Sequence, residues 1–119
     1  MIGVFRGDHP RVKLVLPGRQ GSIEIEFVAD TGFNGDLAVP YQIAVQLESV
    51  RAGPQDYMLA NGQFLQCASY EVMLDWFEES RPTEVLILEG EPLLGTVLMR
   101  EHLLQVEMTD GGETLIEPL

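Results

Sequence analysis

The chain has 119 residues, one cysteine, and 19 acidic against 7 basic residues, which gives a formal net charge of −12. This length fits one domain, 1–119, and the negative field disfavours DNA and RNA as partners. Cys67 alone cannot form an intrachain disulfide, and no apolar run approaches the ~18 residues of a membrane helix. The opening residues lack the features of a signal peptide, so we expect a cytoplasmic protein without a membrane partner.

A β-hairpin is predicted near the start of the chain. Residues 12–16 and 22–29 alternate between apolar and polar side chains, and the Pro-Gly stretch at 17–21 can turn between them. The second strand runs directly into Asp30. One face of the hairpin is expected to carry Val12, Leu14, Leu16, Ile23, Ile25, Phe27 and Ala29, and the opposite face of the second strand Ser22, Glu24, Glu26 and Val28.

A strand, a helix and a loop are predicted next. Residues 37–39 form a short apolar segment, and Pro40 can begin a helix because its missing N–H costs nothing at the first helical position. The apolar face of this helix extends to about Leu47. Residues 51–55 contain Gly53 and Pro54, and we expect a loop there.

A second hairpin is predicted at Asn61-Gly62, because Asn-Gly between apolar segments is the strongest short signal for a hairpin. The flanking segments are residues 57–59 and the stretch from residue 64 onward. The latter predicts a long, bent strand over 64–77, which a polar turn at 78–83 follows.

The last third of the chain is predicted to be mostly strand. Residues 85–88 show no alternation, which indicates a strand buried on both faces. Thr96 is expected to cap a short helix over 96–101, and strands are expected at 103–108 and 114–117. Many short strands with one or two short helices predict an all-β fold class, in the form of a small, closed, barrel-like domain.

The motif Asp30-Thr31-Gly32 stands where the first hairpin ends. One interpretation is an Asx turn, in which Asp30 bonds its own backbone and closes a hairpin. The other places a catalytic carboxylate at the mouth of a rigid β-scaffold, with glycines that allow close backbone approach. The three residues alone leave both interpretations open.

Four features of the chain follow the order found in retroviral-type, retropepsin-like aspartic proteases, and the sequence resembles that family. They are the hairpin that ends in Asp30-Thr31-Gly32, the strand and helix start at 37–40, the Asn61-Gly62 hairpin, and Leu93-Leu94-Gly95 before a short helix. The stretches Asp-Thr-Gly-Phe-Asn-Gly and Gly-Glu-Pro-Leu-Leu-Gly are similar to the small, single-domain prokaryotic members.

The resemblance implies an aspartic endopeptidase, a hydrolase of peptide or protein substrates that works as a homodimer without a cofactor or a metal. Asp30, Thr31 and Gly32 would form the catalytic loop, and each chain would give one Asp30 to a water-activating dyad. The Asn61-Gly62 hairpin would be a flap that closes over the substrate. The residues that would bind substrate are Phe33, Ala60, Asn61, Gly62, Leu94 and Gly95.

Two departures from the family pattern leave a second function open. Phe33 follows Asp-Thr-Gly, where viral-type enzymes carry a smaller residue, and Thr96-Val97 replaces the polar start of the following helix. The alternative is a catalytically weak or inactive dimeric module of the same fold that binds peptide or a partner protein.

The other chemically active side chains have simpler interpretations. His9 and His102 lie far apart in the sequence, with no further ligand at metal-binding spacing, so both are expected at the surface. Cys67 lies in a predicted strand without a matched histidine, so we expect a small buried residue.

Overall fold

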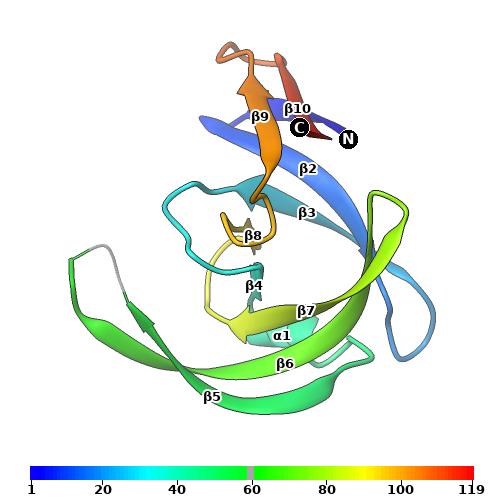
Figure 1. Ribbon diagram of the computed structural model, residues 1–119, viewed down its shortest axis with the longest axis vertical. Coiled ribbons are helices and arrows are strands. Elements are labelled where there is room, and N and C mark those ends of the chain that lie inside the picture. Colours follow the sequence, from blue (N-terminus) through cyan, green and yellow to red (C-terminus); the bar gives the residue numbers. More distant parts are fainter. Residues whose placement is uncertain (59–60) are drawn as a thin grey trace.

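The computed structural model describes residues 1–58 and 61–119, with the backbone alone at 52, 54–58, 64 and 65. Within these residues the protein has ten β-strands and one short α-helix, which confirms the predicted all-β class (Figure 1). The elements are β1 (Ile2–Arg6), β2 (His9–Leu16), β3 (Ile23–Ala29), β4 (Leu37–Val39), α1 (Tyr41–Ala44), β5 (Val50–Met58), β6 (Phe64–Trp76), β7 (Glu79–Ile87), β8 (Leu93–Leu94), β9 (His102–Val106) and β10 (Glu113–Pro118).

All ten strands belong to one curved sheet, in the order β5-β6-β7-β4-β8-β3-β2-β1-β10-β9. The prediction of a closed barrel is wrong, because β5 and β9 are the two ends of this order and do not pair with each other in the described residues. Figure 1 shows these strands at opposite ends of the molecule, since β1, β10 and β9 extend the sheet away from β5. The sheet therefore curls around its core and keeps two free edges.

The core lies between the two halves of the curved sheet. Val12, Leu14 and Leu16 of β2 are each at most 4% exposed, and they belong to the same buried cluster as Val72 and Leu74 of β6. This burial confirms the alternation predicted for residues 12–16. Burying two apolar sheet faces against each other is the main stabilising contribution available to a domain of this size.

The strand that leads to Asp30 follows the predicted alternation with one exception. Ile25, Phe27 and Ala29 are buried, and Glu24 on the opposite face is exposed. Val28, which was expected on the polar face, is only 5% exposed, and it lines a cavity at this end of β3.

The two-residue strand β8 connects the two halves of the sheet. It pairs in parallel with Val28 and Ala29 of β3, and antiparallel with β4 on its other side. All three residues of β4 are buried, and β4 pairs in parallel with β7. Because β8 lies between β3 and β4, the loop over 30–36 bridges two strands that are not neighbours in the sheet.

The hairpin predicted at Asn61-Gly62 is confirmed by the antiparallel pairing of β5 with β6. Gly62 has a φ of 85°, and the Asn61 side-chain oxygen accepts a hydrogen bond from Gln63 N–H at 3.0 Å. The loop predicted at 51–55 is wrong. β5 continues through Gly53, because a register shift between Arg51 and Gly53 absorbs the irregularity.

The turn after β6 is also shorter than predicted. It consists of Phe77 and Glu78, which have positive φ angles of 48° and 69°. β7 begins immediately afterwards, so the turn predicted at 78–83 is wrong. Pro82 is tolerated in this strand because β4 pairs with β7 only from Val85 onward.

The helical content is lower than predicted. α1 begins directly after Pro40, as expected, but it is a single turn, although Leu47 beyond it is buried at 1% exposure. Residues 96–101 form turns, with one helical hydrogen bond from Met99 N–H to the Gly95 carbonyl at 3.2 Å, so the helix predicted there is wrong. Thr96 does not cap a helix, because its hydroxyl bonds to the loop that follows Asp30.

Candidate active site

Asp30 is fixed at the end of β3 by the backbone of β8. Its N–H donates to the Leu94 carbonyl at 2.9 Å, which continues the parallel pairing of the two strands by one residue. The Asp30 side chain is half-buried, and Thr31 and Gly32 beyond it are exposed. The carboxylate therefore leaves a rigid strand at the point where the chain reaches the surface.

The Asx turn considered from the sequence is present in the structure. The Gly32 N–H donates to Asp30 Oδ1 at 2.8 Å, and the Phe33 N–H donates to the Asp30 carbonyl at 3.2 Å. The turn does not close a hairpin, however, because β3 pairs with β2 and β8 and not with β4. Its effect is to orient the carboxylate and to turn the chain over β8.

The loop after Asp30 is anchored to the segment after β8. The Thr96 N–H donates to the Phe33 carbonyl at 2.8 Å, and the Thr96 hydroxyl donates to the Asn34 side-chain oxygen at 2.9 Å. The Val97 N–H donates to the Gly35 carbonyl at 3.1 Å. These bonds join two loops that are far apart in the sequence, so the position of Asp30 depends on both.

Phe33 points away from the surface and into the core. It is 2% exposed and packs with Ala38, Cys67 and Leu86 in a small buried cluster. Burial raises the pKa of the Cys67 thiol, which favours the unreactive protonated form and agrees with its predicted role as a small buried residue. Phe33, the bulky residue after Asp-Thr-Gly, therefore fills the interior, while Thr31 and Gly32 of the same loop stay exposed to solvent.

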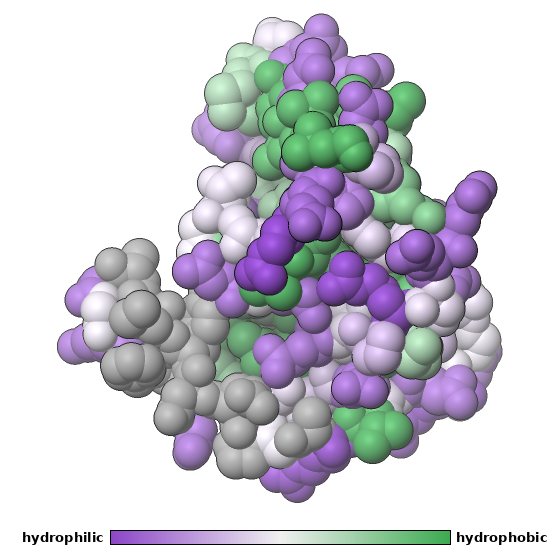
Figure 2. Space-filling view, viewed as in Figure 1, coloured by the Kyte–Doolittle hydropathy of each residue, from purple (hydrophilic) through white to green (hydrophobic). Residues whose placement is uncertain are grey.

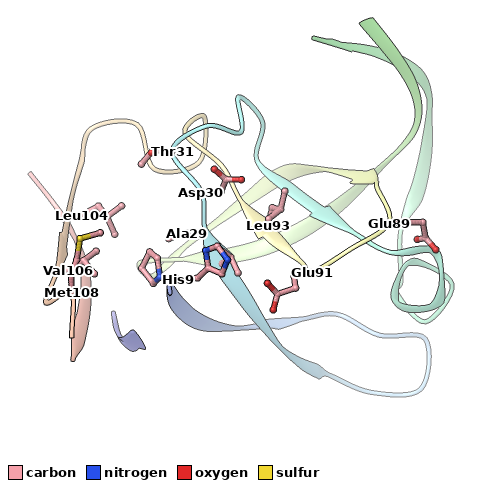
Figure 3. A pocket seen from close by; sticks show the side chains of 12 residues that line it. His9, Ala29, Asp30, Thr31, Glu89, Glu91, Leu93, Leu104, Val106 and Met108 are labelled. Atoms are coloured by element: carbon pink, nitrogen blue, oxygen red, sulfur yellow. The ribbon is translucent and has the colours of Figure 1, made fainter. Parts of the chain in front are cut away.

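A cavity of about 480 Å³ opens beside Asp30 (Figure 3). Figure 3 shows Leu104, Val106 and Met108 on one side of it and acidic side chains on the other, with Asp30 between them. The lining residues are His9, Pro10, Val28, Ala29, Asp30, Thr31, Glu89, Glu91, Leu93, Leu104, Val106 and Met108. The cavity thus combines the Asp30 carboxylate with an apolar wall and an acidic rim.

The acidic rim is partly neutralised by an arginine beneath it. Arg11, whose side chain is only 12% exposed, donates to Glu91 Oε1 at 2.8 Å and lies 3.7 Å from Glu26 Oε1. The hydrogen bond from Arg11 lowers the pKa of Glu91, so this carboxyl stays ionised. Glu89 accepts a hydrogen bond from the Tyr41 N–H at 3.1 Å, which links the rim to α1.

The remaining residues expected at the site lie in three places. Leu94 is fully buried between β3 and β4, and Gly95 packs against the loop after Asp30. Asn61 and Gly62 are exposed at the tip of the β5–β6 hairpin. Ala60 lies outside the described residues. Substrate binding by these residues, and by Phe33, stays a prediction.

Sequence reasoning missed one whole wall of the cavity. The apolar wall comes from β9 and from Met108 just after it, and only the order of strands in the sheet brings them close to Asp30. Glu91 had a signal in the sequence, because it immediately precedes the Pro-Leu-Leu-Gly stretch. His9, expected at the surface, is exposed and lines this cavity.

Other kinds of site find no support in the part of the chain that the structure describes. Residues 1–58 and 61–119 hold no group of three or more His, Cys, Asp or Glu side chains arranged to bind a metal. No helix within these ranges has the length and apolar character needed to cross a bilayer. Comparison of the chain with family models, with curated proteins and with solved structures gave no match.

Proposed function

We propose that the protein is an aspartic endopeptidase that works as a homodimer. The observation that carries the proposal is the placement of Asp30, which an Asx turn and a backbone bond to Leu94 hold at the mouth of a cavity. The order of motifs along the chain, which resembles retropepsin-like proteases, supports the same function. The fold of each chain would then be one half of a two-fold symmetric enzyme.

The chemistry requires two carboxylates close together. One must be ionised to take a proton from the attacking water, and the other must hold a proton to polarise the scissile carbonyl. The chain carries one Asp-Thr-Gly, at 30–32, so the second carboxylate is that of Asp30 from another copy. A two-fold axis through the site supplies it, and the homodimer becomes a requirement of the mechanism.

The neighbouring residues take supporting roles in this proposal. Thr31, which is exposed beside the cavity, would hydrogen-bond across the two-fold axis and hold the two loops together. The Gly32 N–H donates to Asp30 Oδ1 and so orients the carboxylate. The Asn61-Gly62 tip would close over an extended peptide and exclude water from the dyad.

The buried position of Phe33 removes one objection to this function. The side chain that departs from the viral-type pattern occupies the interior beside Ala38 and Leu86, so it does not crowd the carboxylate. A structural role for Asp30 remains the second candidate, because its bond to Gly32 N–H alone would stabilise the turn. In that case the dimer would bind peptide without cleaving it.

The experiment that separates the two functions is Asp30→Asn, assayed for cleavage of a mixed peptide library and for peptide binding. Asparagine keeps the oxygen that accepts from Gly32 but cannot act as acid or base, so cleavage should fall by about 10²–10⁴-fold with binding retained. Asp75→Asn, which removes an exposed carboxylate from β6, is the matched control. Cleavage that survives Asp30→Asn would rule out the aspartic mechanism.

A further inference from the structure

A second cavity, of about 550 Å³, shares no lining residue with the cavity beside Asp30. This turn cavity lies where the β6–β7 turn meets the start of β9 and the end of β10, and residues from three segments line it, 76–81, 100–102 and 118–119. Trp76 bonds to His102 across it, and Leu119 N–H donates to the Glu101 carbonyl at 3.1 Å. Figure 2 shows hydrophilic and apolar side chains next to one another over the part of the molecule where Figure 1 places the β6–β7 turn.

Two arginine side chains of the turn cavity have no partner. Within the part of the chain whose side chains are described, the guanidinium groups of Arg81 and Arg100 make no ion pair and no hydrogen bond. The chain has 19 acidic residues for 7 basic ones, so acidic partners are not scarce. Other basic residues do pair with a glutamate, namely Arg6, Arg11 and Lys13. The turn cavity thus holds two positive charges that the fold itself does not use.

The backbone beneath each of these arginines is nevertheless fixed. The Thr83 hydroxyl donates to the Arg81 carbonyl at 3.2 Å, and His102 Nδ1–H donates to the Arg100 carbonyl at 2.8 Å. Arg81 is also half-buried. Groups that are positioned in advance lose less freedom when a ligand binds, and a guanidinium group can hold a carboxylate through two parallel hydrogen bonds. The two arginines are therefore preorganised donors for an anion.

Aromatic rings form the apolar side of the turn cavity. The Phe77 ring meets Trp76 edge to face with the centroids 5.0 Å apart, and it lies 5.2 Å from the ring centroid of His102. Both nitrogens of His102 are occupied, because Nε2 accepts from Trp76 Nε1–H at 3.1 Å and Nδ1–H donates to the Arg100 carbonyl. The histidine therefore holds its neighbours in place, and the half-buried Phe77 ring offers an apolar surface to a ligand.

The backbone at the turn cavity is strained. Phe77, Glu78 and Glu101 have φ angles of 48°, 69° and 65°, a conformation that favours glycine and asparagine. For a residue as bulky as phenylalanine it is a clear outlier. Strain of this kind is concentrated at binding sites, where a side chain is kept for its contacts with a ligand. Phe77 and Glu101 both line the cavity, so the strain lies where a ligand would be in contact.

We propose that the turn cavity binds a carboxylate that is attached to an apolar or aromatic group. The two guanidinium groups hold the carboxylate, and the Phe77 ring covers the apolar part. Glu79 and Glu101 also line the cavity, and their charges repel a polyanion while the arginines compensate a single negative charge. Because the turn cavity and the Asp30 cavity have no residue in common, the inference does not rest on the proposed protease function.

The test is isothermal titration calorimetry on the full chain with small carboxylates. N-acetylphenylalanine carries a carboxylate beside an aromatic ring, as the C-terminus of a peptide can, and phenylacetate carries the same two groups as a free organic acid. N-acetylphenylalaninamide lacks the carboxylate and acetate lacks the ring, so each should bind at least about tenfold more weakly. The tighter of the two complete probes identifies the source of the ligand.

Substitution of the arginines locates the binding. Arg81→Gln and Arg100→Gln should each raise the Kd of the tighter probe about tenfold or more, because a hydrogen bond to a charged group is lost. Arg51→Gln is the matched control. It removes the same charge from an exposed residue of β5 that does not line the turn cavity, so the Kd should stay unchanged.

Several results would overturn the inference. They are a lack of saturable binding of both complete probes at millimolar concentration, equal affinity for the amide and the acid, and a loss in Arg51→Gln as large as that in the other two variants. Loss of binding in Asp30→Asn would also overturn it, because the probe would then occupy the other cavity. Peptide cleavage is not the readout, so a chain without protease activity tests the inference equally well.

Discussion

The ring of Phe33 occupies the space above Gly35, so that a Cβ atom at Gly35 would lie 2.6 Å from Phe33 Cζ. No real Cβ contact is that short, and only the outer ring atoms are in the way. We therefore expect Gly35→Ala to destabilise the fold by about 1–3 kcal/mol, the usual effect of overpacking a core. Urea unfolding followed by the emission of the single tryptophan, Trp76, measures the change.

A second substitution tests the cause. Leucine at position 33 lacks the ring atoms that meet Gly35, so Phe33→Leu should recover part of the loss in the double mutant. Gly95→Ala is the control. Its Cβ would also meet the Phe33 ring, at 2.7 Å from Cδ2, but its shortest contact is with the Gly35 carbonyl oxygen at 2.2 Å, which is backbone and which Phe33→Leu leaves in place. If Phe33→Leu recovered equal stability in the Gly35→Ala and Gly95→Ala variants, the Phe33 ring would not be the cause of the loss at Gly35.

Trp76 and His102 provide a second test of the packing. The buried Trp76 Nε1–H donates to His102 Nε2 at 3.1 Å, while His102 Nδ1–H donates to the Arg100 carbonyl at 2.8 Å. His102→Leu would leave the indole N–H without an acceptor, which costs about 1–3 kcal/mol for a buried donor. The free energy of unfolding in urea should fall by this amount.

His102→Gln offers a carbonyl oxygen in place of the ring nitrogen. If the hydrogen bond to Trp76 matters, the glutamine variant should lose less stability than the leucine variant. Equal losses of stability in the two variants would mean that His102 contributes through packing. Its ring centroid lies 5.4 Å from that of Trp76 and 5.2 Å from that of Phe77.

Acid should weaken the fold through the ion pairs beneath the cavity. A hydrogen bond from Arg6 lowers the pKa of Glu26 below its ordinary value of 4.5, and the bond from Arg11 lowers that of Glu91 in the same way. A group whose pKa is lower in the folded state adds stability above its unfolded pKa and loses it as the pH falls through the folded value. The melting temperature should therefore decrease between about pH 5 and about pH 3.

Glu26→Gln should flatten this part of the pH curve, because glutamine does not titrate. Glu24→Gln on the same strand is the control, since Glu24 is exposed and its nearest cation, Lys13, is 3.8 Å away. Pairs of that kind contribute little in water. A curve that responds equally to both substitutions would show that Arg6 and Arg11 are not the cause.

The rate of peptide cleavage should follow a bell-shaped pH profile with its maximum on the acidic side of neutral. A dyad of two carboxylates works only while it holds one proton, so it loses its base at low pH and its acid at high pH. The surrounding negative charge helps to retain that proton, and salt should weaken this effect by screening. Assays from about pH 3 to about pH 8 at low and high salt check both points; a maximum above neutral would contradict the dyad.

Local patterns in the sequence predicted the strands whose burial alternates. Val12, Leu14 and Leu16 face the core as expected, and Asn61-Gly62 sits in the predicted hairpin. The position of Asp30 at a strand end was also visible in the sequence. Each of these features depends on neighbours within a few residues, which is the range over which periodicity and turn chemistry act.

The errors arose where distant parts of the chain decide the outcome. Gly53 and Pro54 signal a loop, yet an edge strand tolerates both. Phe77 and Glu78 carry none of the glycine or asparagine that usually marks a turn with positive φ. The strand β1 has too little alternation to be predicted, and its position is fixed by pairing with β2 and β10. Local patterns likewise could not show that the sheet stays open, because this depends on the order in which all the strands pair.

The position of β8 between β3 and β4 determines when the loop after Asp30 can form during synthesis of the chain. Asp30 depends on Leu94, and Phe33 on Thr96, which is 63 positions later. The loop can therefore acquire its shape only after residues 94–97 have been synthesised, since bonds of such long range form late. The loop around Asp30 therefore lacks these anchors until residues 94–97 are available, and the carboxylate of the proposed catalytic site would not yet be in place.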